Sequence, residues 1–201
     1  MKNEGDVFNL YRNTFMLIYG DLVVVSGKKP PELLEQLENC MAHFAVAKTS
    51  LDPEVSQDNI DAVYRHIVRA SLDAAKLLWT ILHENAIAFV KDEDVRRFCA
   101  NASQGAVHNQ YTKAESASLD ARRSEIANVG IDPEKSIEKW YMAALEYRTL
   151  LSLIDMDKVS GLRKLKLTTK IRENIISYII SFVLGVVAST VVAWYWPTPP
   201  Q

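Results

Sequence analysis

Cysteine and glycine are both scarce in this 201-residue chain, which has two of the former and seven of the latter. Two cysteines cannot supply the framework of a disulfide-stapled secreted domain, and seven glycines exclude a collagen-like repeat. The chain also lacks the Asn-Gly and Asp-Gly dipeptides of tight hairpins and has few alternations of β-branched and polar residues. We therefore expect an all-α fold whose thiols are reduced.

Motifs of catalytic sites are also missing. The chain has no glycine-rich phosphate loop and no Gly-x-Ser-x-Gly turn. His83 and Glu84 begin like a helical zinc-protease motif, but Ile87 stands where the second histidine would be needed. We predict no catalytic residue and no cofactor, and we keep a membrane-anchored enzyme only as an alternative.

The few thiols and imidazoles do not predict a metal site either. Cys40 and His43 are three residues apart, whereas Cys99 and His108 are nine apart, which is no usual zinc-ligand spacing. Nothing in the sequence links the two pairs. Buried thiols and ordinary histidines explain these residues more simply.

Charge is nearly balanced over the whole chain but unevenly distributed. The formal net charge of −2 gives no reason to expect a nucleic-acid partner. Residues 1–161 hold 18 Lys and Arg against 24 Asp and Glu, whereas residues 162–201 hold 5 against 1. The carboxyl-terminal part is therefore basic, whereas the rest of the chain is acidic.

One long uncharged run dominates that part of the chain. No charged residue lies between Ile175 and Trp196, and a helix of this length spans roughly 33 Å, enough to cross a hydrocarbon core about 30 Å thick. The run ends in aromatic residues typical of a membrane interface, namely Trp194, Tyr195 and Trp196. We predict a transmembrane helix over 175–196.

The flanks of this run predict its orientation. Basic residues precede it, whereas the tail 197–201 carries no charge. An excess of positive charge on one side predicts a cytoplasmic amino-terminal part and a carboxyl terminus across the membrane, the arrangement of a tail anchor in a bacterial inner membrane or a eukaryotic endomembrane. The basic residues would also contact anionic lipid headgroups; they are Arg163, Lys164, Lys166, Lys170 and Arg172.

Small residues recur every four positions within the predicted span. Such spacing lets two membrane helices approach closely, and serine hydroxyls can form hydrogen bonds across the contact. The same hydroxyls can also bond to their own helix backbone, so the pattern alone leaves both readings open. We favour association into a homo-oligomer through Ser177, Ser181, Gly185, Ser189 and Ala193.

Residues 1–160 predict a cytoplasmic bundle of about five helices. The stretch 53–91 carries two apolar seams with steps of three and four residues, which predicts a helix in the middle of the bundle. Apolar stripes also predict helices around Phe8–Val25 and Leu34–Phe44. Residues 92–131 have few large apolar side chains and predict either an exposed helix or a segment that orders on a partner.

The expected organisation is thus a bundle over 1–160, a basic juxtamembrane connector over 161–174, a span over 175–196 and a short non-cytoplasmic tail over 197–201. The function that fits is a non-enzymatic, oligomerising membrane effector or adaptor whose bundle binds or senses a protein or small ligand. A membrane-perturbing bacterial defence effector would have this plan. The alternatives are a tether that recruits a cytoplasmic partner without assembly of the spans, and a membrane-anchored enzyme.

Overall fold

The computed structural model describes the backbone of residues 1–128 and 130–195. The side chains it describes are those of the same residues as far as 185, apart from 169, 170, 172–176, 179 and 183. All regular structure in this part of the chain is helical, as the sequence predicts. The chain forms two compact units, which divide after Ile154.

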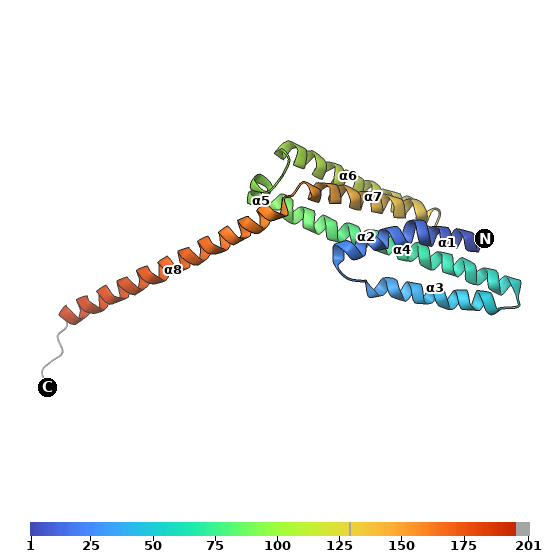
Figure 1. Cartoon of the computed structure of the whole chain (residues 1–201), viewed down its shortest axis with the longest axis horizontal. Helices are drawn as coiled ribbons and strands as arrows, with labels where there is room; N and C mark the ends of the chain where they lie inside the picture. The colour runs from blue at the N-terminus through green and yellow to red at the C-terminus, as the bar shows by residue number, and fades with distance from the viewer. Residues whose placement is uncertain (129, 196–201) are drawn as a thin grey trace, which may run out of the picture. The chain divides into compact units, whose positions relative to one another are not determined.

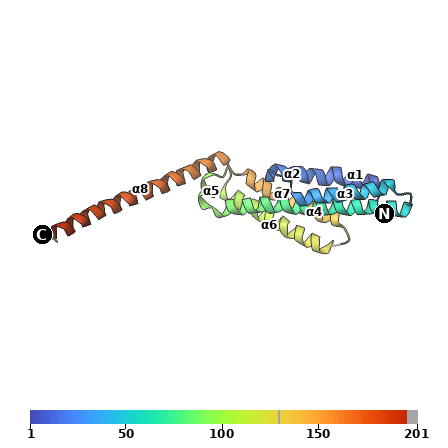
Figure 2. The same cartoon turned by 90° about the horizontal axis from the view of Figure 1, so that it is seen from below.

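The first unit is a helical bundle. Figures 1 and 2 show its helices side by side, with α3 next to α4 and α6 next to α7. Its elements are α1 (Glu4–Leu10), the π-helical turn η1 (Tyr11–Phe15), α2 (Met16–Ser26), α3 (Pro31–Thr49), α4 (Pro53–Lys91), α5 (Glu93–Phe98), α6 (Gln104–Ala127) and α7 (Pro133–Ser152).

Helix α4 is the centre of the bundle and has the bounds that the sequence predicts. Its start is set by Asp52, whose side chain accepts a hydrogen bond from the backbone N–H of Glu54, and by Pro53 in the first turn. Both apolar seams are largely buried, because α4 packs against α2, α3 and α7. The fully buried Ala74 and Leu78 represent one seam and Ala75 the other.

The first helical run contains a π-helical turn that the sequence pattern did not predict. The buried positions step through Val7, Leu10, Phe15, Ile18 and Leu22. The step of five residues spans η1, where one additional residue enters the turn and rotates the buried face. The predicted stripe is therefore correct from Phe15 onward. It is wrong before η1, where its first residue, Phe8, is exposed.

Helix α3 shows a similar shift of its buried face. The sequence predicts a stripe that includes Leu34 and Met41, but both are exposed. The buried positions are Leu33, Cys40 and Ala47, seven residues apart and facing α4. The small side chains at two of these positions allow a close helix contact, which a search for large apolar residues does not detect.

Helix α6 lies within the stretch 92–131, for which the sequence left an exposed helix and a disordered segment open. It is a regular helix that packs along α7. Its buried contacts come from Val107, Ala114 and Ala121, again seven residues apart. The contact is made by small side chains, so the sequence of α6 carries little apolar signal.

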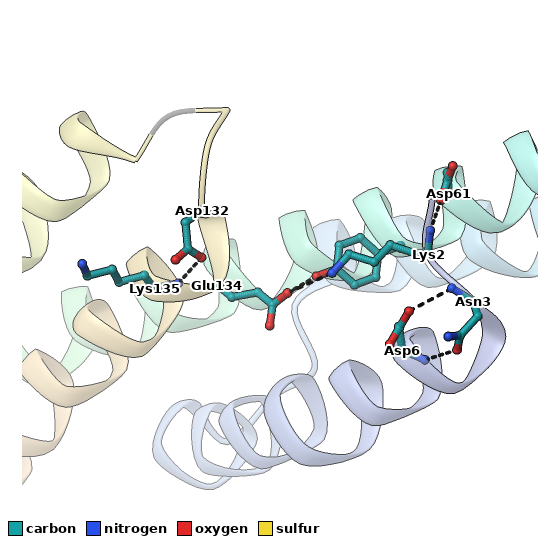
Figure 3. Close-up of polar contacts among 8 residues, drawn as sticks. Lys2, Asn3, Asp6, Asp61, Asp132, Glu134 and Lys135 are labelled. Carbon is teal, nitrogen blue, oxygen red and sulfur yellow. Dashed lines mark hydrogen bonds and ion pairs between the residues drawn. The ribbon is translucent and has the colours of Figure 1, made fainter.

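Polar contacts tie the amino terminus to the bundle (Figure 3). The backbone N–H of Lys2 donates to Asp61 of α4 over 2.8 Å, and Lys2 Nζ lies 3.6 Å from a carboxylate oxygen of Glu134 in α7. The Tyr64 hydroxyl donates to the same carboxylate. Asn3 then caps α1. These contacts join α1, α4 and α7 at one end of the unit.

The second unit contains α8 (Met156–Tyr195), a single helix of 40 residues that Figure 1 draws without a break. The predicted basic connector over 161–174 is part of this helix. Asp155 precedes the first turn, and its side chain accepts hydrogen bonds from the backbone N–H groups of Asp157 and Lys158. This is the capping interaction that begins a helix.

Candidate functional site: an aromatic cleft and the carboxyl-terminal helix

A cleft of about 530 Å³ opens between α4 and α6, with α7 as its floor. Helix α7 packs against both neighbours, which brings the side chains of the three helices together. The wall from α4 carries Trp79 and His83, and the floor carries Trp140 and Tyr147. The wall from α6 carries Glu115, Ser118, Leu119 and Arg122.

The aromatic rings of the cleft are packed into a defined arrangement. Trp79 and His83, one helical turn apart, stack with centroids 4.8 Å apart and planes at 14°. Trp140 meets Trp79 edge-on at 5.0 Å, and Tyr147 meets His83 edge-on at 5.1 Å. Trp140 and Tyr147 are almost fully buried, whereas Trp79 and His83 are half-buried. The wall from α4 is therefore held by the floor and open to solvent.

Hydrogen bonds hold this arrangement in place. The indole N–H of Trp79 donates to Ser118 Oγ over 2.9 Å, which links α4 to α6. The Ser118 hydroxyl in turn donates to the carbonyl of Ala114. The indole N–H of Trp140 donates to Glu125 over 3.1 Å. Both indole N–H donors are satisfied inside the protein, so a ligand need not supply hydrogen-bond partners for them.

One end of the cleft is cationic. Lys76 forms an ion pair with Glu125, and Arg122 lies 3.4 Å from the same carboxylate. Burial alone would raise the pKa of Glu125, but hydrogen bonds from Lys76 and Trp140 outweigh it and keep the pKa below its usual value. Two cations thus meet at the Glu125 carboxylate, and the nearby Asp73, which pairs with Arg69, also interacts with Lys76.

The other end of the cleft is acidic. Glu115 lies seven residues before Arg122 on α6. A hydrogen bond to Glu115, together with burial, raises the pKa of Tyr111 to about 12. Burial is also the main cause that raises the pKa of Tyr147. Both phenols are therefore neutral at physiological pH, and Glu115 is the anionic group at this end.

The remaining histidines and cysteines do not gather at the cleft. His108 lines a separate pocket beside Val107 and Tyr111, away from His83. Cys40 in α3 and Cys99, which follows α5, are buried free thiols, and burial raises the pKa of Cys40 to about 11. Among the described residues, no three His, Cys, Asp or Glu side chains are placed to hold a metal ion.

The uncharged run of α8 exposes its large apolar side chains. The exposed fraction is 77% for Tyr178, 54% for Ile180, 73% for Phe182 and 63% for Leu184. In water such a surface is unfavourable by roughly 25 cal/mol for each Å² of apolar area. Burial of this part of α8 in an apolar environment or against an apolar partner would therefore be favourable.

The residues predicted for association and for membrane contact divide between described and undescribed parts. Ser177, Ser181 and Gly185 are exposed on α8. The basic Arg163, Lys164 and Lys166 are also exposed. Outside the described residues or side chains lie Lys170, Arg172, Ser189, Ala193, Trp194, Tyr195 and Trp196, together with the tail 197–201.

A search for membrane spans gives a negative result for the described part. Restricted to those residues, no helix combines the length and the hydropathy needed to cross a bilayer. The predicted span 175–196 falls largely on side chains that the structure does not describe.

Comparison of the chain with protein-family models, with curated proteins and with solved structures finds no match.

The sequence did not single out the cleft. Trp79 and His83 share a face of α4, and Trp140 and Tyr147 share a face of α7, so the pairs are visible in the spacing. Which helices face one another is not visible there. The polar residues of α6 that complete the cleft carry no motif.

Proposed function

We propose that the protein is a single-pass membrane protein whose helical bundle binds or senses a ligand and whose carboxyl-terminal helices associate. In this proposal α8 anchors the chain through residues 175–196, with the bundle in the cytoplasm and the carboxyl terminus across the membrane. The bundle acts through binding, and the associated spans make the protein an oligomerising effector or adaptor. The observation that carries the proposal is the exposed apolar surface of α8.

The distribution of that surface favours lipid over a protein groove. Tyr178, Ile180, Phe182 and Leu184 follow one another in steps of two, so they point at about 0, 200, 40 and 240° around the helix axis. An amphipathic helix that docks on a protein concentrates its apolar residues on one face. Apolar side chains on opposite sides of a helix are typical of a segment surrounded by acyl chains.

The small residues of α8 support association of the spans. Ser177, Ser181 and Gly185 are exposed at intervals of four, a spacing at which two helix backbones can approach closely. A Cβ atom at Gly185 would meet no heavy atom of the described part of the chain within 4 Å, its own helical backbone aside. A larger residue at this position therefore meets no clash within the described part of the chain, and we use its effect on the oligomeric state as a test of contacts with another chain.

The basic residues Arg163, Lys164 and Lys166 support the orientation. They are exposed on α8 just before the uncharged run. At a cytoplasmic leaflet each would gain about 1 kcal/mol from anionic headgroups.

Membrane anchoring is tested by fractionation of cells that express the full chain. We expect the protein in the membrane fraction, resistant to extraction with alkaline carbonate. Release by carbonate would indicate peripheral attachment and would contradict the proposed span.

Association is tested by the oligomeric state of the full chain in mild detergent. Gly185→Ile should convert a defined oligomer to monomer, whereas the matched variant Leu184→Ile, one residue away, should leave it intact. A membrane-bound monomer in the wild type would favour the tether, in which the span only holds the bundle at the membrane. An oligomer that survives Gly185→Ile would place the contacts elsewhere.

A further inference from the structure

The aromatic cleft offers a ligand few groups beyond its rings. Both indole N–H groups and the Ser118 hydroxyl are already engaged within the protein. Among the described residues, neither imidazole nitrogen of His83 has a hydrogen-bond partner. The ligand-facing groups are therefore ring edges, the His83 imidazole nitrogens and the charged residues at the two ends.

The charged residues Glu115 and Arg122 mark the two ends of the cleft and give it an acidic and a basic end. Glu115 and Arg122 lie seven residues apart on α6, which places them on one face with an axial separation of about 10 Å. The half-buried Trp79 and His83 lie on the facing wall. From one end to the other, the cleft presents an anion, an aromatic surface and a cation.

At the cationic end, Arg122 shares its carboxylate with a second cation. Lys76 and Arg122 share the single carboxylate of Glu125, and the Arg122 side chain is 65% exposed. A guanidinium in this position can turn from Glu125 toward an incoming oxyanion, because it binds phosphate oxygens with two parallel N–H donors.

We propose that the cleft binds a purine nucleotide, a planar heteroaromatic ring that carries a phosphate. The ring packs edge-on against Trp79 and His83, whose facing planes already stack on each other. The phosphate binds Arg122, and an exocyclic amino group donates to Glu115. The cleft volume of about 530 Å³ suits a ligand of this size, because small-molecule pockets range over about 300–1,000 Å³.

This inference rests on the proposed sensing function and names the chemistry of the sensed ligand. His83 gives specificity for a heteroaromatic ring over a hydrocarbon ring, because an imidazole nitrogen can donate to or accept from a ring nitrogen. The satisfied indole N–H groups and the buried floor keep the walls in place before the ligand arrives, which reduces the ordering cost of binding.

The test measures binding of AMP, GMP and adenosine to the full chain in detergent by calorimetry and by tryptophan fluorescence. The chain has four tryptophans, two in the cleft and two near its carboxyl end. A Trp194→Phe and Trp196→Phe background therefore leaves Trp79 and Trp140 as the only reporters. We expect saturable quenching by at least one of the two nucleotides and weaker binding of adenosine.

Two pairs of variants assign the contacts. Arg122→Gln should weaken nucleotide binding at least tenfold and leave adenosine binding unchanged, whereas the neighbouring control Arg123→Gln should change neither. His83→Ala should weaken both nucleotide and nucleoside, and the control His108→Ala should not.

Absence of nucleotide binding at millimolar concentration would overturn the inference. So would binding that is insensitive to both Arg122→Gln and His83→Ala, or equal affinity for AMP and adenosine. Carbonate resistance and oligomeric state are measured on the same preparations. Loss of binding with an intact membrane oligomer refutes the nucleotide alone, whereas a wild-type chain that is released from the membrane refutes the anchoring function whatever the cleft binds.

Discussion

Helices α4 and α8 have nearly the same length, 39 and 40 residues, but they separate polar from apolar residues in different ways. In α4 the charged residues form a strip along the whole helix, and the apolar seams on either side are buried against α2, α3 and α7. In α8 the charges are separated along the chain instead. Basic residues occupy 163–172, and the run from 175 onward has none.

The distribution of polar residues around a helix decides which environment can cover its apolar side chains. A helix that is polar on one side can be covered by other helices and still meet water, so α4 suits the interior of a bundle. A helix that is apolar on all sides over 20 residues or so has no side for water.

Truncation of one leucine in α4 should destabilise the bundle, whereas truncation of one leucine in α8 should not. Leu78 is 1% exposed in α4, so Leu78→Ala should lower the free energy of unfolding by about 2–5 kcal/mol. Leu184 in α8 is exposed, so Leu184→Ala should leave bundle stability unchanged. Urea unfolding of the full chain, followed by circular dichroism, measures both. Equal destabilisation by the two variants would contradict the contrast.

A charge in the middle of the uncharged run of α8 should weaken membrane anchoring. Leu184→Lys places a cation where insertion costs about 3 kcal/mol, so the fraction of chain that resists carbonate extraction should fall sharply. Leu184→Phe keeps the site apolar and serves as the control. If the lysine variant remains fully resistant, residues 175–196 are not a span.

Loss of the cap that begins α4 should have a smaller effect. Asp52 accepts a hydrogen bond of 2.9 Å from the backbone N–H of Glu54, so Asp52→Ala should lower the free energy of unfolding by about 1 kcal/mol. Asp58→Ala on the exposed strip of α4 is the control and should stay within about 0.5 kcal/mol of wild type. The same urea titration distinguishes them.

A modest pH dependence should arise where α4 meets α3. His66 stacks on His43 with centroids 5.2 Å apart. Burial first, then the positive charge of His43, Arg65 and Arg69, holds the pKa of His66 below its usual value. The unfolded chain then binds this proton more readily than the folded one. Stability from this group is complete above pH 6.5 or so and is lost as the pH falls toward the folded-state pKa.

The variant His66→Gln tests this dependence. It should flatten the decline in the free energy of unfolding between about pH 7 and 5. The exposed His108 on α6 provides the control, because His108→Gln should leave the slope unchanged. A slope that persists in His66→Gln would assign the titration to another group.

The sequence predicted the parts of the fold that depend on local patterns. The extent of α4 agrees with its two regular seams, and Asp52 and Pro53 set its start. Gly27 ends α2, and Pro30 and Pro31 begin α3. Gly27 has a φ of 69°, a conformation that favours glycine. These features are local because caps, proline and left-handed turns act over a few residues.

The buried faces of α1 and α3 could not be read from the spacing of large apolar residues. In α1 the π-helical turn changed the register, and in α3 the small Cys40 and Ala47 face α4 in place of the larger Met41. Helix α6 had the same character, with Ala114 and Ala121 at its contact with α7. Close helix contacts select small residues, which carry almost no hydropathy signal.

The sequence alone was enough to predict an all-α chain, the extent of its central helix and the separation of a basic, apolar carboxyl-terminal part. It did so because helix propensity, capping and charge are properties of neighbouring residues. The structure was needed to show that Trp79 and His83 of α4 meet Trp140 of α7 and Arg122 of α6 in one cleft. That outcome depends on which helix faces touch, and the packing of side chains far apart in the sequence decides it.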